Sequence, residues 1–387
     1  MADLTVRGAR VVLPTGVAHV DVSIDNGVIS GIGATTGDRP GRTIDATGMI
    51  VTAGLIDVQC NGAGGSDFTG DPSSIAAAAR VLPRFGVTAF LPTIVTAPAA
   101  ARRAAIAALP AAVTDAARPL GLHFEGPAIS ADHLGAHDAR FRTEPTELRA
   151  EVDEWIAGGV RMVTLAPELD GAIELVATLS DAGVTVSAGH TAMTPTDFAA
   201  AKRAGLRSVT HLFNAMAPFG HRSPGPVGAV LADDDIVAGL ICDGVHVDPL
   251  AVRAAWRTLG PGRVLLVSDA SAPLGLPYGR FRLGRRELIH DESGVRTPDG
   301  TLAGSALPLD RAIRHLCDFA GCDWADAVSA ATSVPADLLG RPDLGRITPG
   351  AAGDIVMFDD AFHPRLVVIG GQVVHRDEQW EVDRWKS

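Results

Sequence analysis

Four apolar runs in the middle of the chain each end on a side chain that can bind a divalent metal. The four end residues are Glu125, His190, His211 and Asp269. In a parallel (β/α) barrel the carboxyl ends of all strands converge on one face, so groups far apart in the sequence meet in space. We therefore expect a barrel whose mouth holds these four side chains as one cluster.

Strand and helix signals alternate regularly between the two ends of the chain. Alanine-rich helical segments separate eight candidate strands, at residues 50–58, 88–93, 120–125, 161–166, 185–190, 208–212, 237–242 and 263–269. Eight is the strand number of a TIM-like barrel, which takes roughly 250 residues. The alternation predicts an α/β fold built on a (β/α)8 barrel over residues 51–344.

Both ends of the chain are predicted to form short strands broken by turns. Asn26-Gly27 separates two candidate strands near the start, and Gly370-Gly371 separates two near the end. Asn-Gly is the strongest short hairpin signal because both residues tolerate a positive φ. Since a lone hairpin is marginal in water, we expect the two ends to pair into one small β-sandwich domain, residues 1–50 plus 345–387.

Charge and composition exclude several classes of partner. The net charge of -12 argues against a nucleic-acid-binding or anionic-membrane surface, because those partners need a cationic field. No run of about 18 apolar residues predicts a membrane span. The four cysteines are too few for a disulfide framework. We therefore expect a cytoplasmic protein with no nucleic-acid and no membrane partner.

The residue types at the predicted mouth favour a metal site. One glutamate and two histidines suit zinc, with three protein ligands and a fourth position left for water. A lone histidine at a strand end is more often a hydrogen-bonded core residue. The joint occurrence of Glu125, His190 and His211 reverses that expectation. The same set also tolerates iron, manganese or cobalt.

Short motifs extend this pattern over essentially the whole chain. They are Gly54-Leu55-Ile56-Asp57-Val58-Gln59-Cys60-Asn61-Gly62, His123-Phe124-Glu125-Gly126-Pro127, Gly135-Ala136-His137, Ala188-Gly189-His190-Thr191, His211-Leu212-Phe213-Asn214-Ala215-Met216, Asp243-Gly244-Val245-His246, Ser268-Asp269-Ala270 and Gly300-Thr301-Leu302-Ala303-Gly304-Ser305. Each is short, but together they are specific. With these motifs the chain resembles the N-acetylglucosamine-6-phosphate deacetylases of the amidohydrolase superfamily.

The resemblance implies hydrolysis of the acetamide of N-acetyl-D-glucosamine 6-phosphate to D-glucosamine 6-phosphate and acetate. Glu125, His190 and His211 would hold a metal that activates water and polarises the carbonyl. Asp269 would act first as general base toward the water and then as general acid toward the sugar nitrogen. His137 would help to polarise the acetyl carbonyl as an oxyanion donor.

The first barrel strand departs from a pattern common in the superfamily. Many relatives carry His-x-His there and bind a second metal with it, whereas this chain has Gln59-Cys60-Asn61. Neutral amides are poor ligands for a zinc-like ion, so we expect one divalent metal per subunit, with Gln59 and Asn61 making hydrogen bonds around it. Lys202 and Lys386, the only lysines, stand far from strand ends, which argues against a carbamylated lysine bridging two metals.

The resemblance also assigns the substrate contacts. Arg222, His246 and the backbone amides of Asn214 and Ala215 would bind the sugar phosphate, since a guanidinium matches phosphate geometry through paired hydrogen bonds. In the family this arginine reaches across from the neighbouring subunit, which implies a homodimer. The resemblance assigns further contacts with the substrate to Ala136, Leu302, Ala303 and Gly304.

Two alternatives stand beside this reading. One is a related amidohydrolase that acts on the galactosamine epimer or on another N-acyl amino sugar. The other is a sugar-phosphate sensor without turnover. Asp269 argues against the sensor, because a binding protein has no use for a proton shuttle, and Arg222 with His246 argues against a neutral substrate. Motif spacing does not separate the two epimers.

Overall fold

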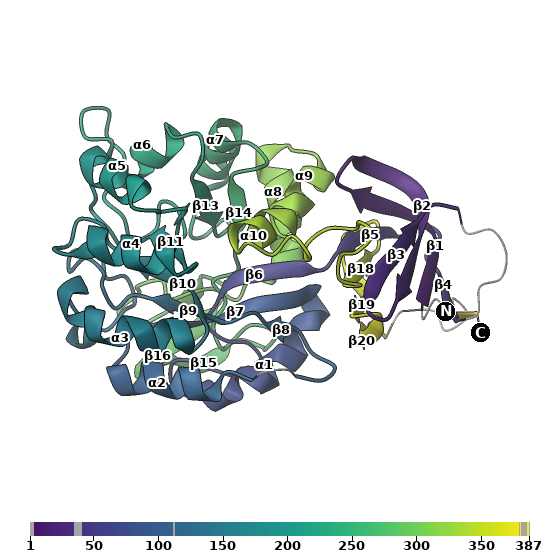
Figure 1. The fold of residues 1–387 in the computed structure, drawn as a ribbon, viewed down its shortest axis with the longest axis horizontal. Helices are drawn as coiled ribbons and strands as arrows, with labels where there is room; N and C mark the ends of the chain where they lie inside the picture. Colours follow the sequence, from purple (N-terminus) through teal and green to yellow (C-terminus); the bar gives the residue numbers. More distant parts are fainter. Residues whose placement is uncertain (1–3, 35–40, 111–112, 379, 381–384, 387) are drawn as a thin grey trace.

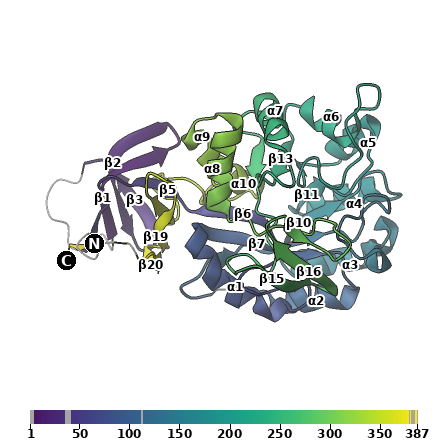
Figure 2. The same cartoon turned by 180° about the vertical axis from the view of Figure 1, so that it is seen from behind.

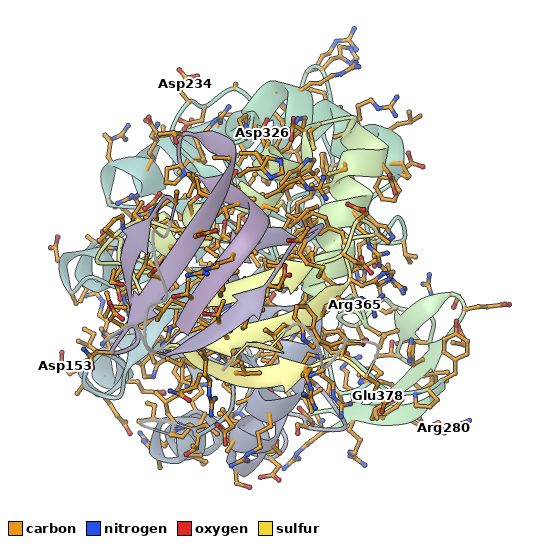
Figure 3. All side chains as sticks on the ribbon, turned by 90° about the vertical axis from the view of Figure 1, so that its right-hand side faces the viewer. Asp153, Asp234, Arg280, Asp326, Arg365 and Glu378 are labelled. Carbon is orange, nitrogen blue, oxygen red and sulfur yellow. The ribbon has the colours of Figure 1, made fainter. Side chains whose placement is uncertain are left out.

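The computed structural model describes residues 4–34, 41–110, 113–378, 380 and 385–386, and it contains two adjoining units. The larger unit is a barrel of strands surrounded by helices, and the smaller is a sheet that carries strands from both ends of the chain (Figures 1 and 2). Charged side chains project from the periphery, Asp153, Asp234 and Arg280 among them (Figure 3). No helix in the described part of the chain is long and apolar enough to cross a membrane.

Eight parallel strands form the barrel. In the order of their pairing they are β6 (Leu55–Cys60), β7 (Val87–Val95), β9 (Leu122–Glu125), β10 (Val160–Leu165), β11 (Thr185–Ala188), β12 (Ser208–Val209), β13 (Val237–Leu240) and β14 (Val264–Leu266), with the short β8 (Arg118–Pro119) beside β7. A parallel bridge between Cys60 and Ala270 brings the first and last strands together. The predicted barrel is confirmed.

One predicted barrel strand, residues 50–58, is in fact two. β5 (Ile50–Ala53) pairs with strands of the smaller unit, and only β6, from Leu55 onward, belongs to the barrel. The chain passes from one sheet to the other at Gly54, where a Cβ would lie 2.0 Å from Thr88 Oγ1. A continuous apolar run contains no signal for such a change of sheet, because both halves are buried.

Helices cover the outside of the barrel (Figure 1). They are α1 (Ile75–Val81), α2 (Ala99–Ala108), α3 (Pro145–Ala157), α4 (Ala172–Asp181), α5 (Pro195–Arg203), α6 (Gly225–Leu231), α7 (Pro249–Leu259), α8 (Leu309–Ala320), α9 (Trp324–Ser329) and α10 (Ser333–Leu338). The edge-on packing of Trp155 in α3 against Phe124 in β9, with ring centroids 5.2 Å apart, is typical of the contacts between the two layers. The sequence pattern predicts no helix at α6, and it predicts one helix over residues 324–339, which the structure divides into α9 and α10.

The smaller unit is a nine-stranded sheet, which we call the composite sheet. Its strands are β1 (Leu4–Leu13), β2 (Gly16–Asp25), β3 (Val28–Ile32), β4 (Arg42–Asp45), β5, β18 (Ile355–Phe358), β19 (Pro364–Ile369), β20 (Gln372–Arg376) and β21 (Trp385–Lys386). Strands β5 and β18 pair with each other, so the two ends of the chain share one sheet as expected. The hairpin between β2 and β3 has φ of 51° at Asn26 and 76° at Gly27, as a type I′ turn requires.

A three-stranded sheet follows the last barrel strand, and the sequence pattern did not predict it. We call it the flap: β15 (Gly279–Leu283), β16 (Arg286–Asp291) and β17 (Gly294–Arg296). Its apolar side, with Leu283, Leu288 and Val295, packs on Val95 and Ala303 at the end of the barrel. The flap therefore forms one wall above the carboxyl ends of the strands.

Candidate active site

A cavity of about 210 Å³ opens at the carboxyl ends of the barrel strands. It is lined by Asn61, Val95, Glu125, Gly135, Ala136, His137, His190, His211, Asn214, Ala215, Ile241, His246, Asp269, Leu283, Thr301, Leu302 and Gly304. The barrel thus gathers most of the predicted site residues in one place. Arg222 and Ala303 do not line this cavity, and neither does Gln59.

The backbone at the mouth takes conformations that L-residues rarely adopt. His190, His211 and Asp269, each just beyond a strand, have φ of 51°, 32° and 46°, and Phe213 and Ala215 in the next loop have 80° and 48°. These are five of the eight described non-glycine residues with positive φ. Such strain costs of order 1–3 kcal/mol per residue and persists where the surrounding structure imposes it. The barrel therefore holds these side chains at angles that a relaxed strand would not give.

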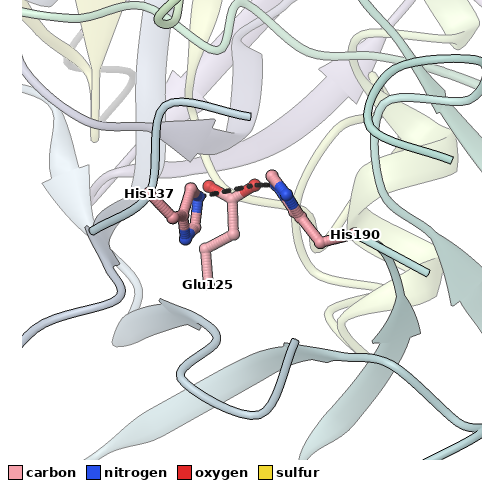
Figure 4. A group of neighbouring side chains, drawn as sticks. All are labelled: Glu125, His137 and His190. Atoms are coloured by element: carbon pink, nitrogen blue, oxygen red, sulfur yellow. Dashed lines mark hydrogen bonds and ion pairs between the residues drawn. The ribbon is translucent and has the colours of Figure 1, made fainter. Parts of the chain in front are cut away.

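Glu125, His190 and His211 are buried and meet at one point. Figure 4 shows Glu125 between His190 and His137, which also lies close to it. Glu125 Oε1 lies 3.1 Å from His190 Nε2 and 2.9 Å from His211 Nε2, and the two Nε2 atoms are 3.1 Å apart. These separations are close to about 3.3 Å, the edge of a tetrahedron whose corners lie 2.0–2.1 Å from a zinc ion. Burial alone would raise the pKa of Glu125, but the neighbouring imidazoles of His190 and His211 hold it well below its ordinary value.

The tautomer of His190 shows why a cation fits this point. Its Nδ1–H donates to the carbonyl of His133 at 2.8 Å, so in the neutral ring Nε2 is an acceptor that faces the carboxylate of Glu125. Two acceptors 3.1 Å apart repel each other unless a proton or a cation lies between them. A backbone carbonyl on the far nitrogen is also the usual partner of a metal-binding histidine. The donor set therefore suits a divalent metal.

His137 has a different tautomer. Thr96 places its N–H 3.4 Å and its Oγ1 2.8 Å from Nδ1. A backbone N–H can only donate, so Nδ1 accepts and the neutral ring carries its proton on Nε2, which lies 3.9 Å from Glu125 Oε1. Burial, followed by the effect of nearby His190, lowers the pKa of His137 to about 3. At neutral pH His137 thus presents an N–H donor near the trio, not a free lone pair.

Asp269 faces the trio from the other side of the barrel. Gln59 Nε2 and Asn61 Nδ2 both donate to its Oδ1, at 3.1 and 2.7 Å. Gln59 Nε2 also lies 3.3 Å from Glu125 Oε1 and links the two carboxylates. Burial, together with the charge of Glu125, raises the pKa of Asp269. Since Oδ1 receives both donors, Oδ2 is the oxygen left for a proton.

The residues predicted to bind phosphate are divided by the structure. His246 lines the cavity, and its Nδ1 lies 2.6 Å from Asp243 Oδ2, which orients the ring. Asn214 and Ala215 also line the cavity, but the Asn214 N–H donates to the carbonyl of His211 at 2.9 Å. Arg222 stands on an exposed loop. Among the described residues, none that lines the cavity is an arginine or a lysine.

The loop after the flap brings Thr301, Leu302 and Gly304 to the cavity. Leu302 and Gly304 line it, whereas Ala303 is 1% exposed and packs beneath the flap. A Cβ on Gly304 would lie 2.8 Å from the carbonyl oxygen of Asp269, so only glycine fits there. Ala136, next to His137 in the chain, also lines the cavity and packs against the same apolar cluster beneath the flap.

Sequence reasoning missed three residues that support the site. Thr96 directly follows β7 and fits the pattern of polar residues at strand ends, but the predicted strand stopped at residue 93. Arg286 in the flap donates to the carbonyl of His137 at 3.0 Å, and the flap itself was not predicted. Asp57 accepts hydrogen bonds from the hydroxyl and N–H of Ser268, beneath Asp269, and burial raises its pKa to about 6.

Comparisons with known proteins agree with this geometry. Residues 50–374 match the model of the amidohydrolase family. The chain is 38% identical to N-acetylglucosamine-6-phosphate deacetylase of Bos taurus, over 88% of this chain and 85% of the bovine one. It is 33% identical to N-acetylgalactosamine-6-phosphate deacetylase of Shewanella sp., over 97% of each chain.

A solved structure extends the likeness to three dimensions. It is that of N-acetyl-D-glucosamine-6-phosphate deacetylase from Mycobacterium smegmatis, an aspartate-to-alanine variant in complex with N-acetyl-D-glucosamine 6-phosphate. It superposes with a TM-score of 0.89 at 30% identity, over 97% of this chain and 100% of that chain. By sequence, fold and the metal-competent trio alike, the chain belongs to the amidohydrolase family and, within it, to the N-acetylglucosamine-6-phosphate deacetylases.

Proposed function

We propose that this protein hydrolyses the acetamide of N-acetyl-D-glucosamine 6-phosphate to D-glucosamine 6-phosphate and acetate. One observation carries the proposal: a carboxylate oxygen and two imidazole nitrogens, about 3 Å apart, face a lone aspartate across the cavity at the mouth of the barrel. That arrangement serves hydrolysis of an unreactive amide, which needs an activated water, a polarised carbonyl and a proton for the amine. The bovine and mycobacterial relatives bear the name of this activity.

Glu125, His190 and His211 are proposed to hold one divalent metal, with zinc as the first expectation and iron, manganese or cobalt as the others. When bound, such an ion supplies activation of water and polarisation of the acetyl carbonyl. Asp269 takes the water proton at Oδ2 and then passes it to the sugar nitrogen as the carbon–nitrogen bond breaks. Gln59 and Asn61 hold its other oxygen.

His137 is proposed as the donor to the acetyl oxygen. Thr96 keeps the proton on Nε2, and Arg286 holds the carbonyl of His137 from the flap. A preorganised donor in a buried site stabilises the negative charge that develops on the oxygen. The wall formed by Ala136, Leu302 and Gly304 would then enclose the sugar ring.

The phosphate requires a cation that the lining of the cavity does not supply. We propose that Arg222 of a second copy of the chain provides it and that the protein is a homodimer. His246, Asn214 and Ala215 would contribute from the subunit's own wall. The exposed position of Arg222 supports this arrangement, since a guanidinium on an exposed loop is accessible to a partner.

An assay of acetate release decides the substrate. The 6-phosphates of N-acetylglucosamine and N-acetylgalactosamine and free N-acetylglucosamine should be compared at equal concentration. The Shewanella relative keeps the galactosamine 6-phosphate as a second candidate. Preference for the glucosamine 6-phosphate supports the proposal. Preference for the galactosamine 6-phosphate would make that sugar the substrate. If neither 6-phosphate releases acetate, the proposed activity is wrong.

A further inference from the structure

One acceptor in the cavity has no partner within the described residues. Asn61 follows β6, is 2% exposed and lines the cavity. Its Nδ2 donates to Asp269 Oδ1 at 2.7 Å, while its Oδ1 is buried and receives no hydrogen bond from the described chain. A buried carbonyl without a donor is costly, so natural sites retain one where something outside the chain supplies the donor.

The orientation of this amide is determined by its neighbour. If the Asn61 amide were turned over, its oxygen would stand 2.7 Å from a carboxylate oxygen of Asp269, and two acceptors would face each other. Gln59 donates to the same carboxylate oxygen from the opposite side. The Asn61 carbonyl therefore points away from Asp269 Oδ1 but stays beside that carboxylate.

The proposed reaction supplies a donor for this position. Water attacks the acetyl carbon, a carbon–oxygen bond forms, the carbon–nitrogen bond breaks, and its electron pair goes to nitrogen. The nitrogen takes the proton that Asp269 received from the water, so acetate and the amine leave in balance. Throughout these steps the nitrogen carries an N–H, which needs an acceptor close to Asp269.

Resting on the proposed function, we propose that Asn61 is a substrate-contacting residue whose Oδ1 accepts the N–H of the acetamide. This hydrogen bond turns the electron pair that develops on nitrogen toward Asp269 Oδ2. It also makes the site selective for an amide over an ester, since an ester oxygen has no hydrogen to donate. A site built for a donor discriminates strongly against analogues that lack it.

The test compares two substrates in three proteins. The substrates are N-acetyl-D-glucosamine 6-phosphate and 2-O-acetyl-D-glucose 6-phosphate, which replaces the N–H with oxygen. The proteins are the wild type, Asn61→Ala and Gln59→Ala. Gln59 is the matched control, because it also donates to Asp269 Oδ1 but does not line the cavity.

Asn61→Ala should lower kcat/KM for the amide about 10- to 100-fold more than for the ester. Gln59→Ala should lower both by the same factor, because Gln59 contacts the carboxylates of Asp269 and Glu125, which serve both substrates, and does not line the cavity. Equal losses in Asn61→Ala would reduce Asn61 to a positioning residue and overturn the inference. If Asn61→Ala does not fold, Asn61→Ser, which keeps a hydroxyl acceptor, should retain more of the amide selectivity than Asn61→Val.

Two further outcomes separate this inference from the proposed function. Metal content measured on the same proteins should be unchanged by Asn61→Ala. A fall from two ions to one per subunit would mean that Oδ1 binds a cation, and the inference would be wrong while the activity stood. Wild-type protein that released acetate from neither substrate would overturn the proposed function itself, and this inference with it.

Discussion

The mouth of the barrel and the composite sheet differ in the types of residue that adopt a positive φ. At the mouth, positive φ falls on His190, His211 and Asp269, residues whose side chains line the cavity. In the composite sheet, the hairpin turns place it on Asn26-Gly27 and Gly370-Gly371, residues that tolerate it. The same conformation is thus imposed by tertiary structure in one region and chosen by local sequence in the other.

Burial of polar groups differs in the same way. The interior of the composite sheet is a cluster of apolar side chains such as Val6, Ile24 and Leu366. At the mouth, Glu125 and Asp269 are 2% and 8% exposed, although carboxylates are rarely buried without partners. The composite sheet, with its apolar interior, contributes stability. The mouth of the barrel, which buries carboxylates, contributes the groups for the chemistry. Five experiments would break or sharpen this contrast.

Removal of the metal should have the largest effect. Chelation should lower acetate release more than about 10³-fold, because activation of water and polarisation of the carbonyl are lost together. Hydrogen exchange should increase in residues 189–216 and stay unchanged in residues 4–32. Full activity after verified removal of all ions would contradict the site. Faster exchange in both regions would mean that the composite sheet also depends on the metal, against the expected difference between the two regions.

Asp269→Asn should lower kcat by about 10²- to 10⁴-fold, because the amide cannot accept and return a proton. Metal content should be retained, which elemental analysis would check. Asp153→Asn, on the outer face of α3, is the matched control and should be neutral. Turnover by Asp269→Asn at the wild-type rate would remove Asp269 from its proposed role.

Ile24→Ala in β2 tests the other region. Ile24 is fully buried, and Gly353 and Gly371 leave room for its Cγ2 methyl group. Truncation should lower the free energy of unfolding by about 2–5 kcal/mol in urea titrations while kcat of the folded protein is unchanged. Val17→Ala on the same strand, at a side chain 45% exposed, should cost far less. A loss of kcat in Ile24→Ala would show that the two regions are coupled.

Arg222→Ala should raise KM for the phosphorylated sugar by about 10- to 100-fold, since a charge-assisted hydrogen bond to phosphate contributes roughly 1.5–3 kcal/mol. The kcat/KM for free N-acetylglucosamine should be unchanged. Arg203→Ala, on the exposed side of α5, serves as the control. Equal losses for both sugars would mean that other groups hold the phosphate.

Ala215→Gly should have the smallest effect. Glycine removes the strain of an alanine in the left-handed region, which adds about 1–2 kcal/mol to the free energy of unfolding. The greater conformational freedom of glycine in the unfolded chain offsets about 0.5–1 kcal/mol of this gain. The melting temperature should rise slightly, and KM should rise because the loop is less well held. Asn26→Gly should gain less stability, because asparagine already tolerates φ of 51°. A larger gain in stability from Asn26→Gly than from Ala215→Gly would mean that the backbone strain is greater in the hairpin than at the mouth, the reverse of what we expect.

Local patterns in the sequence were sufficient to predict the barrel, the composite sheet and the main residues that meet at the cavity. Hydrophobic periodicity is a local property, so the eight strands and most helices could be located from it. Glu125, His190, His211 and Asp269 could be found because each ends a buried strand, and the barrel fold brings strand ends together. The hairpin turns could be predicted because Asn-Gly carries its own conformational preference.

Other features were decided only in three dimensions. The change of sheet at Gly54 depends on the side chain of Thr88 beside it. The tautomer of His137 depends on Thr96, and the free carbonyl of Asn61 depends on Asp269, more than 200 residues away in the chain. The sequence by itself determined which groups come to the mouth. The tertiary structure decided which atom of each group donates, accepts or stays unpaired, because hydrogen-bond direction depends on contacts between distant segments.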